Sequence, residues 1–156
     1  MMCKEYGEAE RPGIIAIVLS NEKLLLLKRR NFPFISNPNI WTFVSGGIKR
    51  DEDYEHAAYR ELFEETGLAK GDLKKIEGPL NVKLFDPRKK ICWANKAYIF
   101  TTSSNKIKLN IENSAYRWAT IKEIETESLY TNIFINKSAI IKKLKSVLYG
   151  EHKTKA

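Results

Sequence analysis

The chain has 156 residues, of which 43% are hydrophobic and 29% are charged, and its formal net charge is +8. These values suit one globular domain with its own core. No apolar run approaches the length of a membrane-spanning helix, and the first residues lack the apolar stretch of a signal peptide. We therefore expect a cytoplasmic protein that does not contact a membrane.

The first strands are indicated by composition and by the turn between them. Residues 1–12 are polar, so we expect a flexible N-terminus, with order beginning at residue 13 after Pro12. The short apolar run Ile14–Leu19 is rich in β-branched residues, which predicts a buried strand. The run Lys23–Lys28 could be helix or strand by composition, but the tight turn before it favours a hairpin partner.

A basic strand end and an irregular loop follow this hairpin. Arg29 and Arg30 lead into Asn31–Asn39, whose prolines and asparagines predict an irregular loop. We interpret the two arginines as candidate phosphate contacts, and Phe32 or Phe34 as a candidate for stacking on a nucleobase. The alternative is a solvated strand end with aromatic side chains that cap the core.

The stretch Gly46–Leu68 carries most of the chemistry that the sequence reveals. Asp53–Thr66 is compatible with a helix throughout, and Gly67 is a typical glycine helix stop. Asp53 follows the glycine loop that Gly46 opens. At about 100° per residue, the carboxylates at positions 61, 64 and 65 share one helix face. Such a face favours a hard divalent cation, whereas the alternative is a solvated acidic face on which residues 60 and 64 form an ion pair.

The spacing of these residues resembles the signature box of the Nudix hydrolases. The matching positions are Gly46, Glu52, Arg60, Glu61, Leu62, Glu64, Glu65, Gly67 and Leu68. The resemblance implies a Mg²⁺- or Mn²⁺-dependent hydrolase of a nucleoside diphosphate linked to another group. It also implies an α/β fold, the Nudix α/β/α sandwich, with a mixed β-sheet between helices.

The resemblance further implies roles for individual residues. Glu52 and Arg60 are expected to form a structural ion pair that ties the loop to the helix. The catalytic residues would be Arg60, Glu61, Glu64 and Glu65. The metal ligands would be Gly46 through its backbone carbonyl, Glu61, Glu64 and Glu65, with Glu61 acting as a ligand or as the general base.

Two strands and a second acidic element are predicted after the box. Leu73–Leu84 and Ile91–Thr101 are predicted strands, joined by a basic turn at residues 86–90. Glu112, six residues before Trp118, resembles an element of small Nudix enzymes in which a loop acid faces the metal cluster from outside the box. Diadenosine tetraphosphate hydrolases have a histidine where this chain has Asn113.

The chain is expected to end in helices. Ile121–Glu127 can begin a short helix, and Asn136–Tyr149 has the apolar spacing of an amphipathic helix that docks on the sheet. Residues 150–156 form a basic tail. We therefore predict one domain over residues 13–149. Two cysteines, Cys3 and Cys92, match no paired metal-ligand spacing and are expected to be free thiols.

The expected substrate is a nucleoside di- or triphosphate or a dinucleoside polyphosphate. Dihydroneopterin triphosphate and the 5′-pyrophosphate of RNA are alternatives, because parts of the chain also resemble the enzymes that act on them. A different class remains open, a non-catalytic Nudix-fold module that binds nucleotide or RNA. The expected partner is thus a small nucleotide, and nucleic acid is not favoured.

Overall fold

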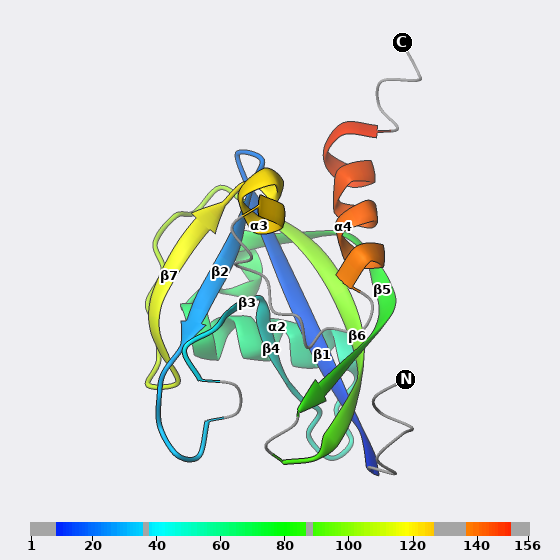
Figure 1. The fold of residues 1–156 in the computed structure, drawn as a ribbon. Helices are drawn as coiled ribbons and strands as arrows, with labels where there is room; N and C mark the ends of the chain where they lie inside the picture. Colours follow the sequence, from blue (N-terminus) through cyan, green and yellow to red (C-terminus); the bar gives the residue numbers. More distant parts are fainter. Residues whose placement is uncertain (1–8, 36–37, 87–88, 127–136, 151–156) are drawn as a thin grey trace.

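The computed structural model describes residues 9–35, 38–86, 89–126 and 137–150 (Figure 1). Its strands are β1 (Ala9–Ser20), β2 (Lys23–Arg29), β3 (Trp41–Thr42), β4 (Val44–Gly47), β5 (Leu73–Asp86), β6 (Ile91–Thr102) and β7 (Asn113–Ala119). Its helices are α2 (Tyr54–Thr66), α3 (Ile121–Thr126) and α4 (Lys137–Lys145), with a 3-10 turn η1 (Lys70–Asp72) and a π-helical turn η2 (Ser146–Gly150).

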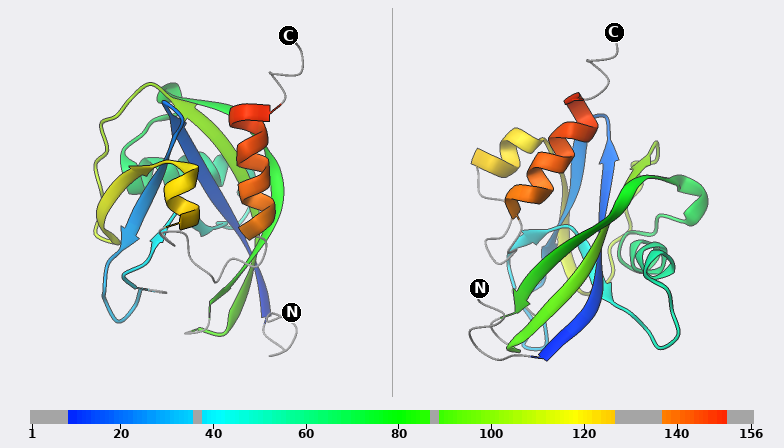
Figure 2. Two further views of the ribbon diagram at one scale, coloured as in Figure 1. Left: turned by 45° about the horizontal axis from the view of Figure 1, so that its top comes forward. Right: turned by 90° about the vertical axis from the view of Figure 1, so that its right-hand side faces the viewer.

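The strands form one mixed sheet with helices on both faces. The sheet order is β3-β2-β1-β6-β5, with β4 paired to β1 and β7 paired to β2. Only the β1–β6 pair is parallel among the described strand pairs. Helix α2 covers one face, and α3 and α4 cover the other (Figure 2). The predicted sandwich with a mixed sheet between helices is confirmed.

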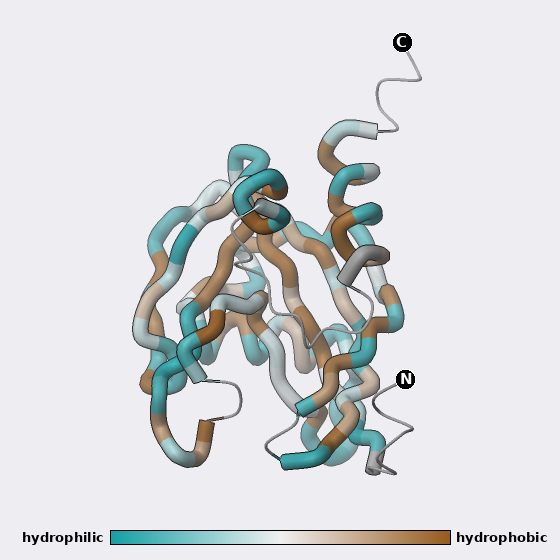
Figure 3. The backbone as a smooth tube through the Cα atoms, viewed as in Figure 1, coloured by the Kyte–Doolittle hydropathy of each residue, from teal (hydrophilic) through white to brown (hydrophobic). Residues whose placement is uncertain are grey.

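Strand β1 supplies the centre of the core to both layers. Its odd-numbered residues from Ile15 to Leu19 pack with α3 and α4, and its even-numbered residues from Ile14 to Val18 pack with α2. Side chains alternate between the faces of a strand, so a continuous apolar run is what a sheet covered on both faces requires. Figure 3 shows hydrophobic residues concentrated along these central strands.

The pairing of β1 places the loop before α2 against the middle of the sheet. The C-terminal end of β1 pairs with β2 through a tight turn, where Asn21 and Glu22 have φ of 51° and 62°. Positive φ at both central residues is the hairpin geometry that matches strand twist. The segment Gly13–Ala16 instead pairs with β4, so Gly46 lies beside Ile14. Strand β4 thereby fixes where α2 begins.

Three expectations need correction. Order begins at Ala9 rather than residue 13, because residues 9–12 of β1 already pair with Ile91–Ala94 of β6. The helix that was expected to reach Tyr149 ends at Lys145, and the chain continues as the turn η2. Cys92 is buried and disulfide-bonded, so the prediction of a free thiol there is wrong.

Some expectations fall outside the described residues. These are the ones for residues 1–8, for Pro87 and Arg88 in the basic turn, for Glu127 and Asn136 at helix ends, and for the tail beyond Gly150. No helix in the described part of the chain has the length and apolar character needed to cross a membrane.

Candidate active site

Helix α2 begins and ends where its capping residues dictate. The Asp53 side chain accepts a 2.7 Å hydrogen bond from the His56 backbone N–H, which satisfies a donor at the helix N-terminus. At the other end, Gly67 has φ of 79° and its N–H donates to the Phe63 carbonyl. This left-handed conformation suits glycine. The helix predicted from the box is confirmed.

Arg60 connects the loop before α2 to the acidic side chains of the helix. Its guanidinium donates to both carboxylate oxygens of Glu52, over 2.7 and 2.8 Å. It also donates to Glu61 over 2.8 Å, to Glu64 over 3.2 Å and to the Gly47 carbonyl over 3.0 Å. The ion pair with Glu52 lowers the pKa of that carboxyl to about 2. One arginine thus holds loop and helix together.

The absence of a side chain at Gly46 lets the strand approach Glu61 closely. A Cβ atom added at Gly46 would clash with the Glu61 carboxyl group. The backbone at this position is fixed by its pairing with Ile14, so the strand cannot simply move away. A side chain at position 46 would therefore displace the Glu61 carboxyl, which is the end of a flexible side chain.

Glu65 is a buried carboxyl in the centre of an acidic cluster. Its residue is 3% exposed, and Asn113 donates to it over 3.3 Å. Burial raises the pKa of Glu65 well above its usual value, and the hydrogen bond and negative charge of Glu61 and the charge of Glu112 raise it further. Arg29 opposes this rise. Carboxyls from α2 and from the loop before β7 therefore interact directly, although they are 47 residues apart or more in sequence.

The loop that carries Glu112 is held by hydrogen bonds to its backbone. The Glu112 N–H donates to the Asn110 side chain over 3.1 Å, and the Glu112 carbonyl accepts from the Arg30 N–H over 2.9 Å. Asn113 is 1% exposed. It occupies the position where the resemblance has histidine, and here it supports Glu65. This supporting contact was not foreseen from the sequence.

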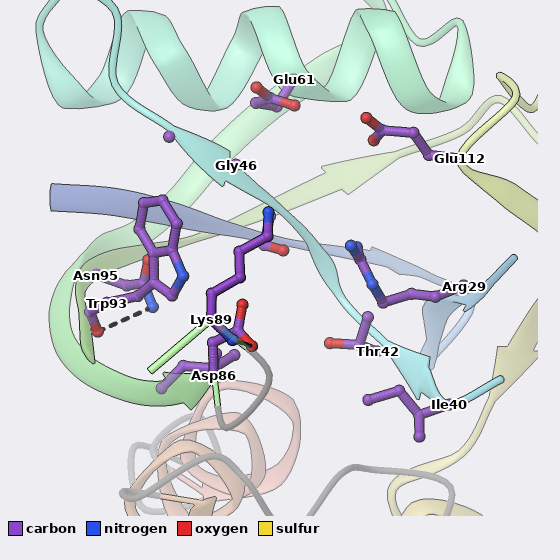
Figure 4. A pocket seen from close by; sticks show the side chains of 13 residues that line it. Arg29, Ile40, Thr42, Gly46, Glu61, Asp86, Lys89, Trp93, Asn95 and Glu112 are labelled. Carbon is purple, nitrogen blue, oxygen red and sulfur yellow. Dashed lines mark hydrogen bonds between the residues drawn. The ribbon is translucent and has the colours of Figure 1, made fainter. Parts of the chain in front are cut away.

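A cleft of about 250 Å³ opens beside this cluster (Figure 4). Glu61 and Glu112 lie on one side, and Arg29 and Lys89 point into the space below them. The full lining is Arg29, Ile40, Thr42, Ser45, Gly46, Gly47, Glu61, Leu84, Asp86, Lys89, Trp93, Asn95 and Glu112. The cleft therefore combines carboxylates, cations and one large aromatic wall.

The structure brings together only part of the predicted site. Gly46, Glu61, Glu112 and Arg29 line the cleft. Glu65 is buried and is not part of the lining, but the charges of Glu61, Glu112 and Arg29 act on it. Glu64 does not line it: its side chain is 47% exposed and paired with Arg60. The three box carboxylates thus lie on adjacent turns but do not share one environment.

The remaining substrate candidates lie outside the cleft lining. Arg30 donates to the backbone carbonyls of Ile111 and Asn113 over 2.8 and 3.3 Å, so its guanidinium ties β2 to the loop before β7. It also lies 5.5 Å from the Phe32 ring centre, and the rings of Phe32 and Phe34 are 5.5 Å apart. This group forms a small cluster on the surface, and Phe34 is 64% exposed, so it does not cap the core as the alternative interpretation of the loop supposed.

Several residues of the cleft were not predicted, because nothing in the sequence around them marks them as parts of a site. Trp93 and Asn95 belong to β6, and nothing in a strand of mixed aromatic and polar residues shows which side chain faces a cleft. Their position depends on the parallel pairing of β1 with β6, a contact between distant segments. For Lys89, the one indication in the sequence was its position in the basic turn before β6.

The donor atoms at the cleft fit a hard divalent cation. In the described part of the chain, no group of three acidic, histidine or cysteine side chains is already arranged as a metal-ligand set. The carboxyls of Glu61 and Glu112 nevertheless act on that of Glu65, and Arg29 is the cation that acts on it. Because Gly46 has no Cβ atom, its strand leaves room for the Glu61 carboxyl. Carboxylate oxygens are the ligands that Mg²⁺ and Mn²⁺ prefer.

Known proteins resemble this chain in sequence and in fold. The family model of the NUDIX domain matches residues 9–142. An RNA pyrophosphohydrolase of Proteus mirabilis is 27% identical over 124 residues, which cover 69% of this chain and 68% of that protein. One from Saccharophagus degradans is 39% identical over 66 residues, which cover 42% of this chain and 36% of that protein. The matches thus span between about a third and two thirds of these relatives.

Solved structures share the fold over nearly the whole chain. A MutT protein from Methanosarcina mazei Go1 superposes with a TM-score of 0.71 at 19% identity, covering 92% of this chain and 98% of that one. An Ap4A hydrolase from C. elegans superposes with a TM-score of 0.69 at 22% identity, covering 92% and 99%. At these identities the likeness concerns the fold alone.

Proposed function

The chain belongs to the NUDIX domain family, and we propose that it is a divalent-metal-dependent pyrophosphohydrolase acting on the phosphoric anhydride bond of a nucleotide. The substrate class is a nucleoside di- or triphosphate or a dinucleoside polyphosphate. The observation that carries the proposal is the convergence of Glu61, Glu65 and Glu112 beside a cleft into which Arg29 and Lys89 point.

The charges of the cleft suit a phosphoric anhydride. Phosphate oxygens repel an attacking nucleophile, so hydrolysis of this bond depends on charge neutralisation and on placement of a water molecule. Arg29 and Lys89 can bind the phosphate oxygens, and Trp93 offers a flat apolar face to the nucleobase. The volume of about 250 Å³ suits one nucleotide unit, so the remainder of a larger substrate would lie outside the cleft.

The acidic cluster would hold the metal. Glu61, Glu65 and Glu112 are the proposed side-chain ligands, and the Gly46 carbonyl is a further candidate. Mg²⁺ or Mn²⁺ bound there would neutralise phosphate charge and lower the pKa of a bound water. Glu64 is a further candidate, because Arg60 donates to only one of its carboxylate oxygens, over 3.2 Å. We assign Arg60 and Glu52 to holding the loop and helix in place.

RNA carrying a 5′-pyrophosphate is the second candidate substrate. The specific support is that the curated relatives are named RNA pyrophosphohydrolases, and that a net charge of +8 favours a polyanionic chain. Such a substrate would place its 5′ end in the cleft and its following nucleotides on the surface beyond it.

The test is a hydrolysis screen with product identification. The panel contains nucleoside di- and triphosphates, dinucleoside polyphosphates and 5′-triphosphorylated RNA, each with Mg²⁺, with Mn²⁺ and with EDTA. We expect hydrolysis of at least one class that EDTA abolishes and that Glu65→Gln reduces strongly. Binding of nucleotide or RNA without turnover on the whole panel would instead support the non-catalytic module.

A further inference from the structure

A second hollow lies on the opposite side of α2 from the cleft. It has a volume of about 940 Å³ and lies between α2, the segment Ala69–Lys70, and the β5–β6 side of the sheet. We call it the tyrosine groove, and its lining is Asp53, Tyr54, Glu55, His56, Tyr59, Arg60, Phe63, Ala69, Lys70, Pro79, Lys96 and Tyr98. None of these residues lines the cleft.

Helix geometry explains why the groove is separate from the cleft. At about 100° per residue, Tyr59 and Phe63 lie about 40° apart and each about 160° from Glu61. The cleft and the groove therefore use opposite sides of one helix. Arg60 is the link between them, because it lines the groove while its guanidinium donates to Glu61 and to the Gly47 carbonyl, which both line the cleft.

The groove is unusually rich in aromatic rings with lysines above them. The Lys70 ammonium lies 5.0 Å from the Tyr59 ring centre, and the Lys96 ammonium lies 5.1 Å from that of Tyr54. The Phe63 side chain lines the same hollow, and its residue is 60% exposed on a helix whose opposite face is core. An exposed aromatic ring beside cations can stack on a base.

The acidic side chains of the groove are already occupied. Asp53 accepts the helix-capping hydrogen bond from the His56 backbone over 2.7 Å. Glu55 pairs with Lys75 over 2.7 Å. Lys70 and Lys96 contact the faces of aromatic rings, and Lys96 also donates to the Asn81 side chain over 3.4 Å. The lining thus contains three side-chain cations, Arg60, Lys70 and Lys96, against the two carboxylates of Asp53 and Glu55.

We propose that the tyrosine groove binds single-stranded nucleic acid, specifically an RNA strand, with a base stacked on the exposed ring of Phe63 and with Lys70 and Lys96 on the phosphates. Aromatic faces beside a row of cations are how proteins bind single strands without reading their sequence. This binding needs neither the metal nor the acidic cluster. It is therefore independent of the proposed hydrolysis.

The test is fluorescence anisotropy with an unstructured RNA of about ten nucleotides that carries a 5′-hydroxyl, in EDTA. Under these conditions no anhydride is present and no metal is bound, so the result does not depend on the proposed activity. We expect Phe63→Ala to weaken binding by about fivefold or more, the range of one lost base stack. Phe63→Trp should restore the affinity, whereas Phe63→Leu should not.

The lysines are tested through the dependence of affinity on salt. Replacing Lys70 and Lys96 together with alanine should make the slope of log affinity against log salt shallower by about 1.4, as two lost contacts with single-strand phosphates predict. The matched control is the exposed pair Lys122 and Lys142, which lie on α3 and α4 across the sheet. Their double replacement should leave the slope almost unchanged.

Either of two results would overturn the proposal. One is equal RNA affinity of the wild type, Phe63→Ala and the Lys70/Lys96 double variant at unchanged melting temperature. The other is self-association of the wild type in sedimentation that Phe63→Ala abolishes while RNA binding persists. That result would identify the groove as a contact between copies of the chain.

Discussion

Replacing Glu52 with glutamine tests how much the clamp between loop and helix contributes to stability. The Glu52 carboxylate accepts two hydrogen bonds from Arg60 and one from the Lys49 N–H over 2.9 Å, and its side chain is 6% exposed. Its pKa is about 2, against an ordinary value of 4.5. This difference corresponds to at most about 3 kcal/mol of folding free energy when the group is charged in both states.

A glutamine keeps one oxygen acceptor, so we expect Glu52→Gln to cost about 2 kcal/mol at pH 7. For a chain of this size, that lowers the melting temperature by roughly 4–8 °C. Because the folded-state pKa is lowered, the contribution of Glu52 is fully present above about pH 4.5 and is lost as pH falls toward 2. The melting temperatures of the wild type and the variant should therefore converge over that range.

The assay is thermal unfolding by circular dichroism between pH 2.5 and 7, over the part of that range in which both proteins are folded before heating. The matched control is Glu55→Gln on the same helix, whose ion pair with Lys75 is partly exposed, with side-chain exposures of 43% and 33%. Exposed pairs contribute about 1 kcal/mol or less. The reasoning would be refuted if Glu52→Gln and Glu55→Gln were equally stable at pH 7, or if the effect of Glu52→Gln did not diminish in acid.

Three further changes test other parts of the site. Arg60→Ala should lower the melting temperature more than Glu52→Gln does and should also reduce turnover, since it leaves several acidic groups without their cation. If stability were unchanged and only substrate affinity fell, Arg60 would instead be a phosphate contact. Gly46→Ala should reduce turnover and affect stability less than Arg60→Ala does, because the methyl group would displace the Glu61 carboxyl at the end of a flexible side chain. Unchanged kinetics would contradict that packing. Glu112→Gln should raise the Mg²⁺ concentration for half-maximal rate, or lower the rate at saturating Mg²⁺, with little change in stability; a Mg²⁺ titration in which neither value moves would make Glu112 a surface acid.

Local patterns in the sequence predicted most of the fold. The run Ile14–Leu19 is β-branched and apolar because both faces of β1 are covered, so composition alone identified a buried strand. The limits of α2 followed from a capping aspartate and a left-handed glycine, which act within one turn of the chain. The start of β1 was missed because Ala9–Pro12 have no β-like composition and are ordered by pairing with β6.

The candidate site was predictable only where its residues lie in the box. Arg29 was predicted because it lies at the basic end of a strand, before the glycine loop. Trp93 and Lys89 enter the cleft through the β1–β6 register and the β5–β6 connection, which no local spacing encodes. Helix periodicity placed Glu64 beside Glu61 and Glu65. It could not show that Arg60 holds Glu64 at the exposed edge while Glu65 is buried.

The central claim is that the buried acidic cluster exists to hold a divalent cation, and Mg²⁺-dependent thermal unfolding of Glu65→Gln tests it most directly. Without metal, the variant should melt at the wild-type temperature or higher, because burial, Glu61 and Glu112 all disfavour the ionised form of Glu65, whereas glutamine carries no charge and can keep the contact with Asn113. Added Mg²⁺ should raise the melting temperature of the wild type and leave that of the variant unchanged. An equal rise in both proteins, or a large loss of stability in the metal-free variant, would contradict the claim.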